Sequence, residues 1–218
     1  MQLLTSAQLG YDATPVLRDV TLSVAPGDKV VLLGRSGAGK STLLAALHQA
    51  LLAQGRRVAL VPQDHALVPQ LSALRNVLMG RLDDHGAFYN LTTLIRPRRR
   101  DRQHALAMLA QVGLTAEADR PVESLSGGQK QRVALARALF RGGDVLLGDE
   151  PLSAVDPAQA EHLARLLRQA FPTAILAMHD LDTARSFGTR LIGLRQGQIR
   201  IDGPIDAVWD RVGALYAR

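Results

Sequence analysis

The stretch Gly34-Arg35-Ser36-Gly37-Ala38-Gly39-Lys40-Ser41-Thr42 decides the fold of this 218-residue chain. It follows a short continuous apolar run, Lys29-Val30-Val31-Leu32-Leu33, which is typical of a strand buried on both faces of a parallel sheet. Residues 43–53, which come next, have a helical composition. Glycines between a strand and a helix let consecutive backbone N–H groups turn inward around an anion, and the positive end of the helix adds to the attraction. The order strand, glycine loop, helix therefore predicts a phosphate-binding loop.

The glycine loop has the spacing of a P-loop, because four residues separate Gly34 from the triplet Gly39-Lys40-Ser41. In such a loop the lysine, here Lys40, reaches the β- and γ-phosphates of a nucleotide, and the hydroxyl group of Ser41 binds Mg²⁺. The alternative interpretation is a plain glycine turn between a strand and a helix. The correct elements on both sides favour the P-loop.

Further apolar strands alternate with helical segments along the rest of the chain. They are expected at residues 57–61, 144–149 and 174–178, with an alternating strand near 20–24 and a hairpin that turns at Gln196-Gly197. Strands that alternate with helices predict an α/β fold with a mainly parallel sheet. We expect a single domain over residues 1–218, with a core of 1–63 and 143–218 and an inserted helical subdomain of about 64–142.

Two adjacent carboxylates, Asp149 and Glu150, follow the apolar strand that begins near residue 144. A carboxylate at such a strand end can hold the Mg²⁺ of a P-loop site, which is the role expected of Asp149. Glu150 is then placed to orient a water molecule. The alternative is ordinary charge at a solvent-facing strand end.

A second candidate anion site lies at Leu125-Ser126-Gly127-Gly128-Gln129. The Ser-Gly-Gly run exposes backbone amides at the start of a helix, as the P-loop does. One chain seldom needs two phosphate cradles for one nucleotide. We therefore expect the second cradle to serve a nucleotide that another copy of the chain holds.

With these motifs the sequence resembles the ATP-binding-cassette (ABC) ATPases over nearly its whole length. The family's motifs occur in their usual order: Tyr11 as the aromatic that stacks on adenine, residues 34–42 as Walker A, Gln63 as the Q-loop, 125–129 as the signature, 145–149 with Glu150 as Walker B and the catalytic glutamate, 153–156 as the D-loop, and His179 as the switch histidine. The resemblance implies a P-loop ABC ATPase core with a small N-terminal antiparallel β part. ATP and Mg²⁺ are the implied cofactors.

The resemblance also implies a head-to-tail homodimer with two ATP molecules at its interface. Residues 34–42 of one copy and Ser126, Gly127, Gly128 and Gln129 of the other would grip each ATP. Glu150 would polarise the attacking water, and His179 would contact the γ-phosphate. Gln63 would link Mg²⁺ and water to the membrane-facing surface, so the implied metal ligands are Ser41, Gln63 and Asp149.

The sequence departs from the family between Lys40 and Gln63, which are only 23 positions apart. The segment that is missing normally supplies part of an antiparallel subdomain beside the nucleotide. The resemblance therefore supports the phosphate contacts more firmly than the stacking of Tyr11 on adenine.

Composition limits the other possibilities. The absence of cysteine excludes disulfides, thiol catalysis and zinc–thiolate sites, and no apolar run reaches the roughly 18 residues of a membrane span. The start lacks the features of a signal peptide, so we expect a soluble, cytoplasmic chain. A net charge of +6 favours anionic partners. The dense run Arg96, Arg98, Arg99, Arg100 and Arg102 is expected to be a solvated face or a membrane contact.

Two classes of ABC protein remain: the ATPase subunit of a transporter, and an ATPase that works on nucleic acid or ribosomes. The second class usually carries tandem cassettes, coiled-coil inserts or zinc modules, for which this chain has no room. We expect a bacterial importer ATPase, peripheral to the cytoplasmic face of the inner membrane. Its partners would be transmembrane permease subunits and, indirectly, a periplasmic solute-binding protein, with no nucleic acid.

The segments 74–82, 98–102, 191–199 and 202–204 resemble those of phosphonate-importer ATPases. The expected cargo is a phosphonate, a phosphite or a related oxyanion; another importer cargo, or an exporter, is the alternative. Near Gln63 the chain is unusually apolar. We expect one or two of Val68, Leu71 and Leu74 to be exposed and to receive a short helix of the membrane subunit.

Overall fold

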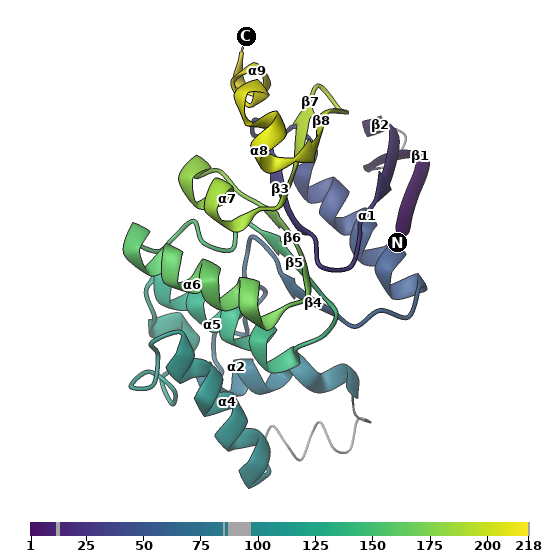
Figure 1. Cartoon of the computed structure of the whole chain (residues 1–218). Coiled ribbons are helices and arrows are strands. Elements are labelled where there is room, and N and C mark those ends of the chain that lie inside the picture. The colour runs from purple at the N-terminus through teal and green to yellow at the C-terminus, as the bar shows by residue number, and fades with distance from the viewer. Residues whose placement is uncertain (12–13, 85, 87–96, 218) are drawn as a thin grey trace.

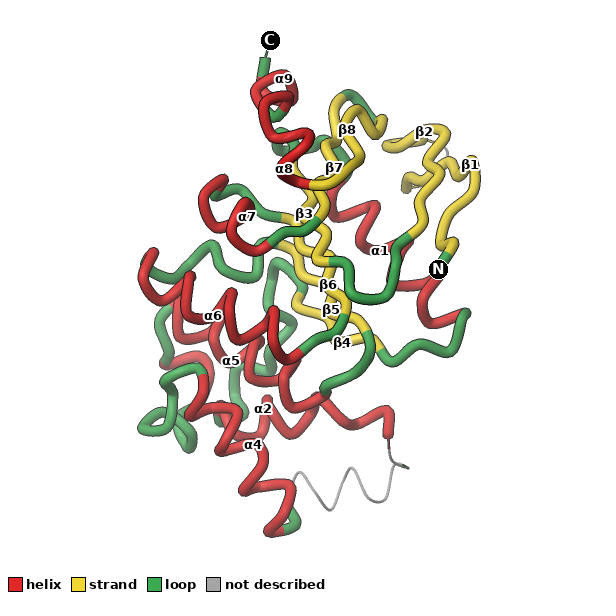
Figure 2. The backbone as a smooth tube through the Cα atoms, viewed as in Figure 1, coloured by secondary structure: helices red, strands yellow, loops and turns green. Residues whose placement is uncertain are grey.

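A six-stranded sheet in the order β4-β5-β6-β3-β7-β8 forms the centre of the molecule (Figures 1 and 2). The computed structural model describes residues 1–11, 14–84, 86 and 97–217. The strands are β3 (Lys29–Leu33), β4 (Val58–Val61), β5 (Val145–Asp149), β6 (Thr173–Ala177), β7 (Arg190–Arg195) and β8 (Gln198–Pro204). All neighbours are parallel except β7 and β8, which form the predicted hairpin at Gln196-Gly197. The mainly parallel α/β sheet is thus confirmed.

The N-terminal strands form a separate antiparallel pair beside this sheet. β1 (Gln2–Tyr11) pairs with β2 (Thr14–Ser23), which confirms the antiparallel β part that the resemblance implied. The sequence pattern identified only the end of β2, because β1 has no clean alternation of apolar and polar residues. The pair has two strands, and the chain passes directly from α1 (Lys40–Ala53) to β4 through residues 54–57.

Alternate residues of β3 build two core layers on opposite faces of the sheet. Val30 and Leu32 pack with the buried leucines of α1 and with β2, whereas Val31 and Leu33 belong to the larger core on the other side. That larger core takes side chains from α5 (Gly127–Arg141), α6 (Pro157–Ala170) and α7 (Leu181–Phe187). In Figure 1, α1 accordingly lies on one side of the sheet and α5, α6 and α7 lie on the other.

The middle of the chain is helical, as predicted. Its elements are α2 (Ala73–Leu78), the 3₁₀ helix η1 (Met79–Asp84), α4 (Arg99–Gln111) and the 3₁₀ helix η2 (Val122–Ser124), followed by α5. Side chains from α2 and α4 share one continuous core with α5 and the sheet. The division at about 64–142 therefore stays a prediction, because α5 packs on both parts.

The chain ends in short helices that cover the last strands: α8 (Ile205–Val208), the 3₁₀ helix η3 (Trp209–Arg211) and α9 (Gly213–Tyr216). Across the described ranges, no helix combines the length and the apolar character that crossing a membrane requires. Arg99, Arg100 and Arg102 lie exposed in the first turns of α4, whereas Arg96 of the basic run falls outside the described residues.

Of the three apolar residues expected to provide an exposed subset after Gln63, the structure buries Leu74. Leu74 is only 5% exposed, and Val68 and Leu71 are half-buried. The buried side chain of Asn76 holds this segment against α2. Its amide group forms hydrogen bonds with backbone groups of Val68, Leu71 and Ser72. Leu74 then lies in the core shared with α4 and α5, and Leu67 packs against it.

Candidate functional site

The glycine loop between β3 and α1 is built on two close backbone approaches. A Cβ atom at Gly39, where φ is +99°, would lie 2.7 Å from Leu17 Cδ2. At Gly34 it would collide with the carbonyl oxygen of Leu194 on β7. Only glycine fits these two positions, so the loop can press against β2 and β7 while its tip, residues 35–37, stays exposed.

Lys40 is the first residue of α1, and its side chain lies inside the loop. The residue is 6% exposed, and Nζ donates hydrogen bonds to the carbonyl oxygens of Gly34 at 2.8 Å and Arg35 at 3.2 Å. Burial lowers the pKa of Lys40, and the nearby carboxylates of Glu150 and Asp149 act in the opposite direction. An ammonium group held by two carbonyls is ready to exchange them for phosphate oxygens.

The start of α1 is open to an anion. Gly39 caps the helix without a side chain, so the first N–H groups of the helix have no side-chain acceptor from the cap. Of the next two residues, Ser41 is exposed and Thr42 is half-buried. Residues 34–42 thus combine the amides at the start of a helix, an ammonium group and hydroxyl groups in one place, an arrangement that suits a phosphate.

The three predicted metal ligands lie around one hollow of about 470 Å³. Ser41 and Thr42 contribute from α1, Gln63 from the turn after β4, and Asp149 from the end of β5. A hydroxyl group, an amide oxygen and a carboxylate are the oxygen donors that Mg²⁺ accepts. The residues present therefore fit this ion.

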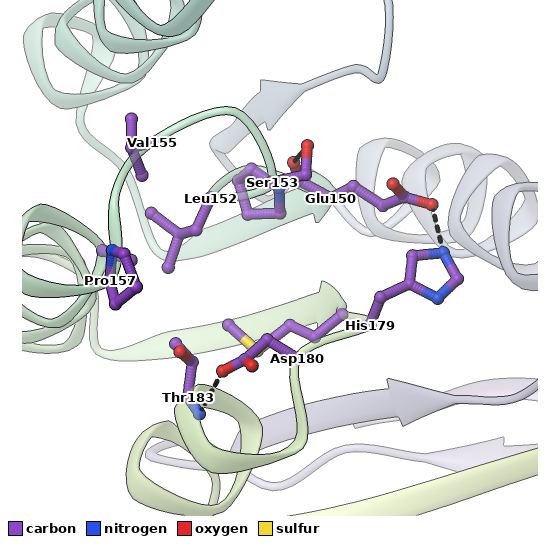
Figure 3. Close-up of a pocket in the computed structure, with 11 residues that line it drawn as sticks. Glu150, Leu152, Ser153, Val155, Pro157, His179, Asp180 and Thr183 are labelled. Carbon is purple, nitrogen blue, oxygen red and sulfur yellow. Dashed lines mark hydrogen bonds and ion pairs between the residues drawn. The ribbon is translucent and has the colours of Figure 1, made fainter.

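Glu150 and His179 form a direct pair at the ends of β5 and β6. Glu150 Oε1 lies 2.5 Å from His179 Nε2, and Figure 3 shows the carboxylate turned toward the imidazole ring. Glu150 has a left-handed backbone, with φ of +54°, and its N–H donates to Ala177 O at 3.0 Å. A non-glycine residue holds this conformation only where its surroundings impose it, and such residues are often functional.

The pair borders a second hollow of about 300 Å³, which Leu152, Met178, Asp180 and Thr183 also line (Figure 3). The adjacent carboxylates Asp149 and Glu150 therefore line two different hollows. That arrangement suits one carboxylate for a metal ion and the other for a water molecule.

The predicted second cradle lies at the start of α5. Ser126 caps the helix: its Oγ accepts the N–H of Gln129 at 3.2 Å, and Gln129 Oε1 accepts the N–H of Ser126 at 2.9 Å. Ser126 and Gly127 are exposed, while Gly128 is half-buried against the segment after β5. In this structure Gln129 stabilises the helix start, and its contact with a nucleotide stays a prediction.

The two cradles belong to helices on opposite faces of the sheet. α1, which carries Lys40, packs in one core layer, and α5, which begins behind Ser126, packs in the other (Figure 1). This placement favours the interpretation that each cradle serves a different nucleotide. The remaining predicted contact, Tyr11, ends β1, and its side chain lies outside the described part of the chain.

Sequence reasoning missed Gln131, which is 1% exposed on α5. Its Nε2 donates to Glu150 O at 2.8 Å and to Ser153 Oγ at 3.2 Å, and its Oε1 accepts the N–H of Ala154 at 2.8 Å. The side chain thus fixes the segment that carries Glu150 to the helix that begins at Ser126. The one feature of the sequence that points to Gln131 is that a polar residue stands among apolar residues of the predicted helix, two positions after Gln129.

The chain is similar to known proteins over most of its length. A family model described as "ABC transporter" matches residues 17–153. The chain is 38% identical to "Phosphonates import ATP-binding protein PhnC 2" of Cupriavidus metallidurans, over 95% of this chain and 83% of that protein. It is 41% identical to "Phosphite import ATP-binding protein PxtA" of Stutzerimonas stutzeri, over 92% of this chain and 81% of that protein.

Solved structures show the same fold. The dimeric post-hydrolysis state of the ATP-binding cassette MJ0796 bound to ADP and Pi superposes with a TM-score of 0.80, at 27% identity over 94% of this chain and 99% of the other. An ABC transporter in an inward-facing conformation gives a TM-score of 0.74, at 27% identity over 92% of this chain and 82% of that chain.

Proposed function

The chain belongs to the ABC transporter family and is an ABC-type ATPase, and from this premise we propose that it is the ATP-hydrolysing subunit of a bacterial importer. One observation carries the proposal: the P-loop, the metal-side hollow and the Glu150–His179 pair form on one chain, while the second cradle at Ser126 belongs to a helix on the opposite face of the sheet. Two copies arranged head to tail would supply two complete sites.

Ser41, Gln63 and Asp149 would hold Mg²⁺ together with the phosphates. When bound, this ion neutralises charge that develops on the β- and γ-phosphate oxygens. The chain would bind the phosphates with the amides of residues 34–42 and with Lys40, whose Nζ leaves the carbonyls of Gly34 and Arg35.

Hydrolysis would then depend on Glu150 and His179. Their direct 2.5 Å contact leaves no room between the two side chains. On ATP binding, Glu150 Oε1 would turn to the attacking water and accept its proton, and His179 would donate to a γ-phosphate oxygen. Ser126, Gly127 and Gly128 of the second copy would cover the same phosphate. Phosphoryl transfer needs mainly such positioning and charge stabilisation.

A groove beside the Q-loop turn is the surface we propose for the membrane subunit. It has a volume of about 330 Å³ and is lined by residues that include Leu52, Leu60, Ala66 and Met79. Leu52 and Leu60 are 43% and 36% exposed. The short connection from α1 to β4 leaves both leucines uncovered, and a short apolar helix of a permease would cover them. This contact would hold the chain at the cytoplasmic face of the membrane.

Leu52→Asp is expected to abolish co-purification of the membrane subunits, because assembly would bury a carboxylate in an apolar contact, and Leu52 lines the groove but not the metal-side hollow. Affinity for Mg-ATP and the melting temperature should stay those of the wild type. Leu181→Asp is a matched control, since Leu181 is 38% exposed on α7, outside the groove lining. Normal assembly of the Leu52 variant, or equal loss in both variants, would place the docking surface elsewhere.

The proposed cargo is a phosphonate or phosphite, since the names of the relatives above state these solutes. Cells that lack this chain should fail to take up radiolabelled phosphite or methylphosphonate, and the wild-type chain should restore uptake whereas Glu150→Gln should not. Unchanged uptake of both solutes in cells that lack the chain would contradict the proposed cargo. It would not contradict the proposed ATPase activity.

A further inference from the structure

The turn that carries Gln63 is followed by two residues in a strained conformation. The turn closes through a hydrogen bond from the N–H of His65 to Pro62 O at 3.0 Å. His65 and Ala66 then both have a left-handed backbone, with φ of +63° and +44°. Residues that have a Cβ rarely adopt this conformation, and two in succession persist only where other groups hold them.

Arg137 of α5 is the group that holds them. Its Nη1 donates to Ala66 O at 2.5 Å and its Nη2 donates to His65 O at 2.6 Å. A guanidinium group presents its N–H groups as a rigid planar fork, so it can bind two neighbouring carbonyls together. The left-handed backbone at His65 and Ala66 accompanies this two-point contact.

The arginine itself is firmly placed. Burial lowers the pKa of Arg137, and the carboxylate of Asp64 beside the turn acts in the opposite direction. Its backbone is fixed as well, because η1 packs so closely that a Cβ at Gly80 would lie 2.6 Å from Arg137 O. The fork therefore has little freedom relative to α5, whose other end is the Ser126 cap.

Both partners of the contact line the groove beside the Q-loop turn. Ala66 and Arg137 occur together in its lining, with Gly80 from η1 and Leu60 from β4. Any group that fills the groove touches the clamped carbonyl segment or the arginine. The two partners thus line the groove, and Gln63, on the same turn as Ala66, lines the metal-side hollow.

We propose that Arg137 is a positioning residue for ATP hydrolysis, which latches the strained turn at residues 62–66 to α5 and thereby holds Gln63 at the metal-side hollow. The inference rests on the proposed function for the role of Gln63. When the latch opens, the left-handed residues relax and Gln63 leaves the site. A partner that fills the groove would touch the latch and would thereby act on the position of Gln63.

The test is a double-mutant cycle in the ATPase activity of the full chain. Arg137→Lys keeps the positive charge but replaces the two-point fork with a single ammonium group, so we expect kcat to fall about tenfold and the Mg²⁺ concentration for half-maximal activity to rise. In a Gln63→Ala background the same substitution should lower kcat less than about twofold, since the residue it positions is gone.

Arg132→Lys is the matched control. Arg132 lies on the same helix and also donates to two carbonyls, Val112 O at 3.0 Å and Gly113 O at 3.2 Å, within the helical part of the chain. Arg132→Lys should leave the Mg²⁺ requirement unchanged, and it should change kcat by the same factor with and without Gln63→Ala. Equal losses from Arg137→Lys in both backgrounds, or the same pattern from Arg132→Lys, would overturn the latch.

Hydrogen exchange of the backbone amides at residues 63–67 tests the latch without hydrolysis. These amides should exchange faster in Arg137→Lys than in the wild type or in Arg132→Lys. Should the lysine variant not fold, Arg137→Gln, which leaves no buried cation, replaces it in both measurements. Unchanged exchange in a folded variant would refute the latch alone, whereas a wild-type chain without ATPase activity would refute the proposed function.

Discussion

Glu150→Gln is expected to bind Mg-ATP as tightly as the wild type and to hydrolyse it at least about 100-fold more slowly. The backbone contacts of Glu150, its N–H to Ala177 O and its carbonyl to Gln131 and Ser153, do not involve the carboxylate. The left-handed turn should therefore survive the substitution. What is lost is the negative charge that orients and deprotonates the attacking water.

Because hydrolysis would end the bound state, its loss should leave an ATP-bound dimer that size-exclusion chromatography detects. Glu161→Gln is the control, since Glu161 is an exposed carboxylate on α6 whose only described ion pair is with Arg165. It should turn over at the wild-type rate and give no stable dimer. Near-normal hydrolysis in Glu150→Gln would remove Glu150 from the site.

Lys40→Ala and Ser126→Arg should separate the two phosphate cradles. Lys40→Ala removes a charge-assisted contact within one chain, so we expect the affinity of the monomer for ATP to fall about 10- to 100-fold, measured by titration with a fluorescent ATP analogue. Ser126→Arg should leave that affinity nearly unchanged and abolish hydrolysis, because the large side chain blocks the phosphate of the partner. Equal loss of monomer affinity in both variants would contradict the head-to-tail arrangement.

The sequence was sufficient for the elements whose chemistry is local. The P-loop between residues 34 and 42 is readable because its glycines and Lys40 fall within one short segment, although the contacts that require Gly34 and Gly39 come from Leu194 and Leu17. Asp156-Pro157 likewise predicts a helix start, and the structure has Asp156 Oδ1 accepting the N–H of Gln159 at 3.0 Å. Recognising such features in a sequence requires no knowledge of distant segments.

Residues whose partners lie far along the chain were beyond reach. Arg137 contacts carbonyls 71 and 72 positions away, and Gln131 reaches over 19 to 23 positions to the segment after β5. A sequence pattern marks both merely as polar residues on a helix. Leu74 was misjudged for a related reason, because the amide of Asn76 reorganises the loop before α2.

The short segment between Lys40 and Gln63 was visible in the sequence, but its consequence needed the structure. The antiparallel pair has two strands, and Leu52 on α1 and Leu60 on β4, the edge strand of the sheet, are exposed. The docking surface that we propose therefore differs from the one expected at Val68, Leu71 and Leu74.

The most direct test of the composite site is the ATPase rate of an equimolar mixture of Lys40→Ala and Ser126→Arg chains. Each variant alone has no site with both cradles intact. A mixed dimer has one intact site, built from the P-loop of the Ser126→Arg chain and the signature segment of the Lys40→Ala chain. Random pairing should restore about a quarter of the wild-type rate. A mixture no more active than its separate components, with both chains folded, would contradict a site shared between two copies.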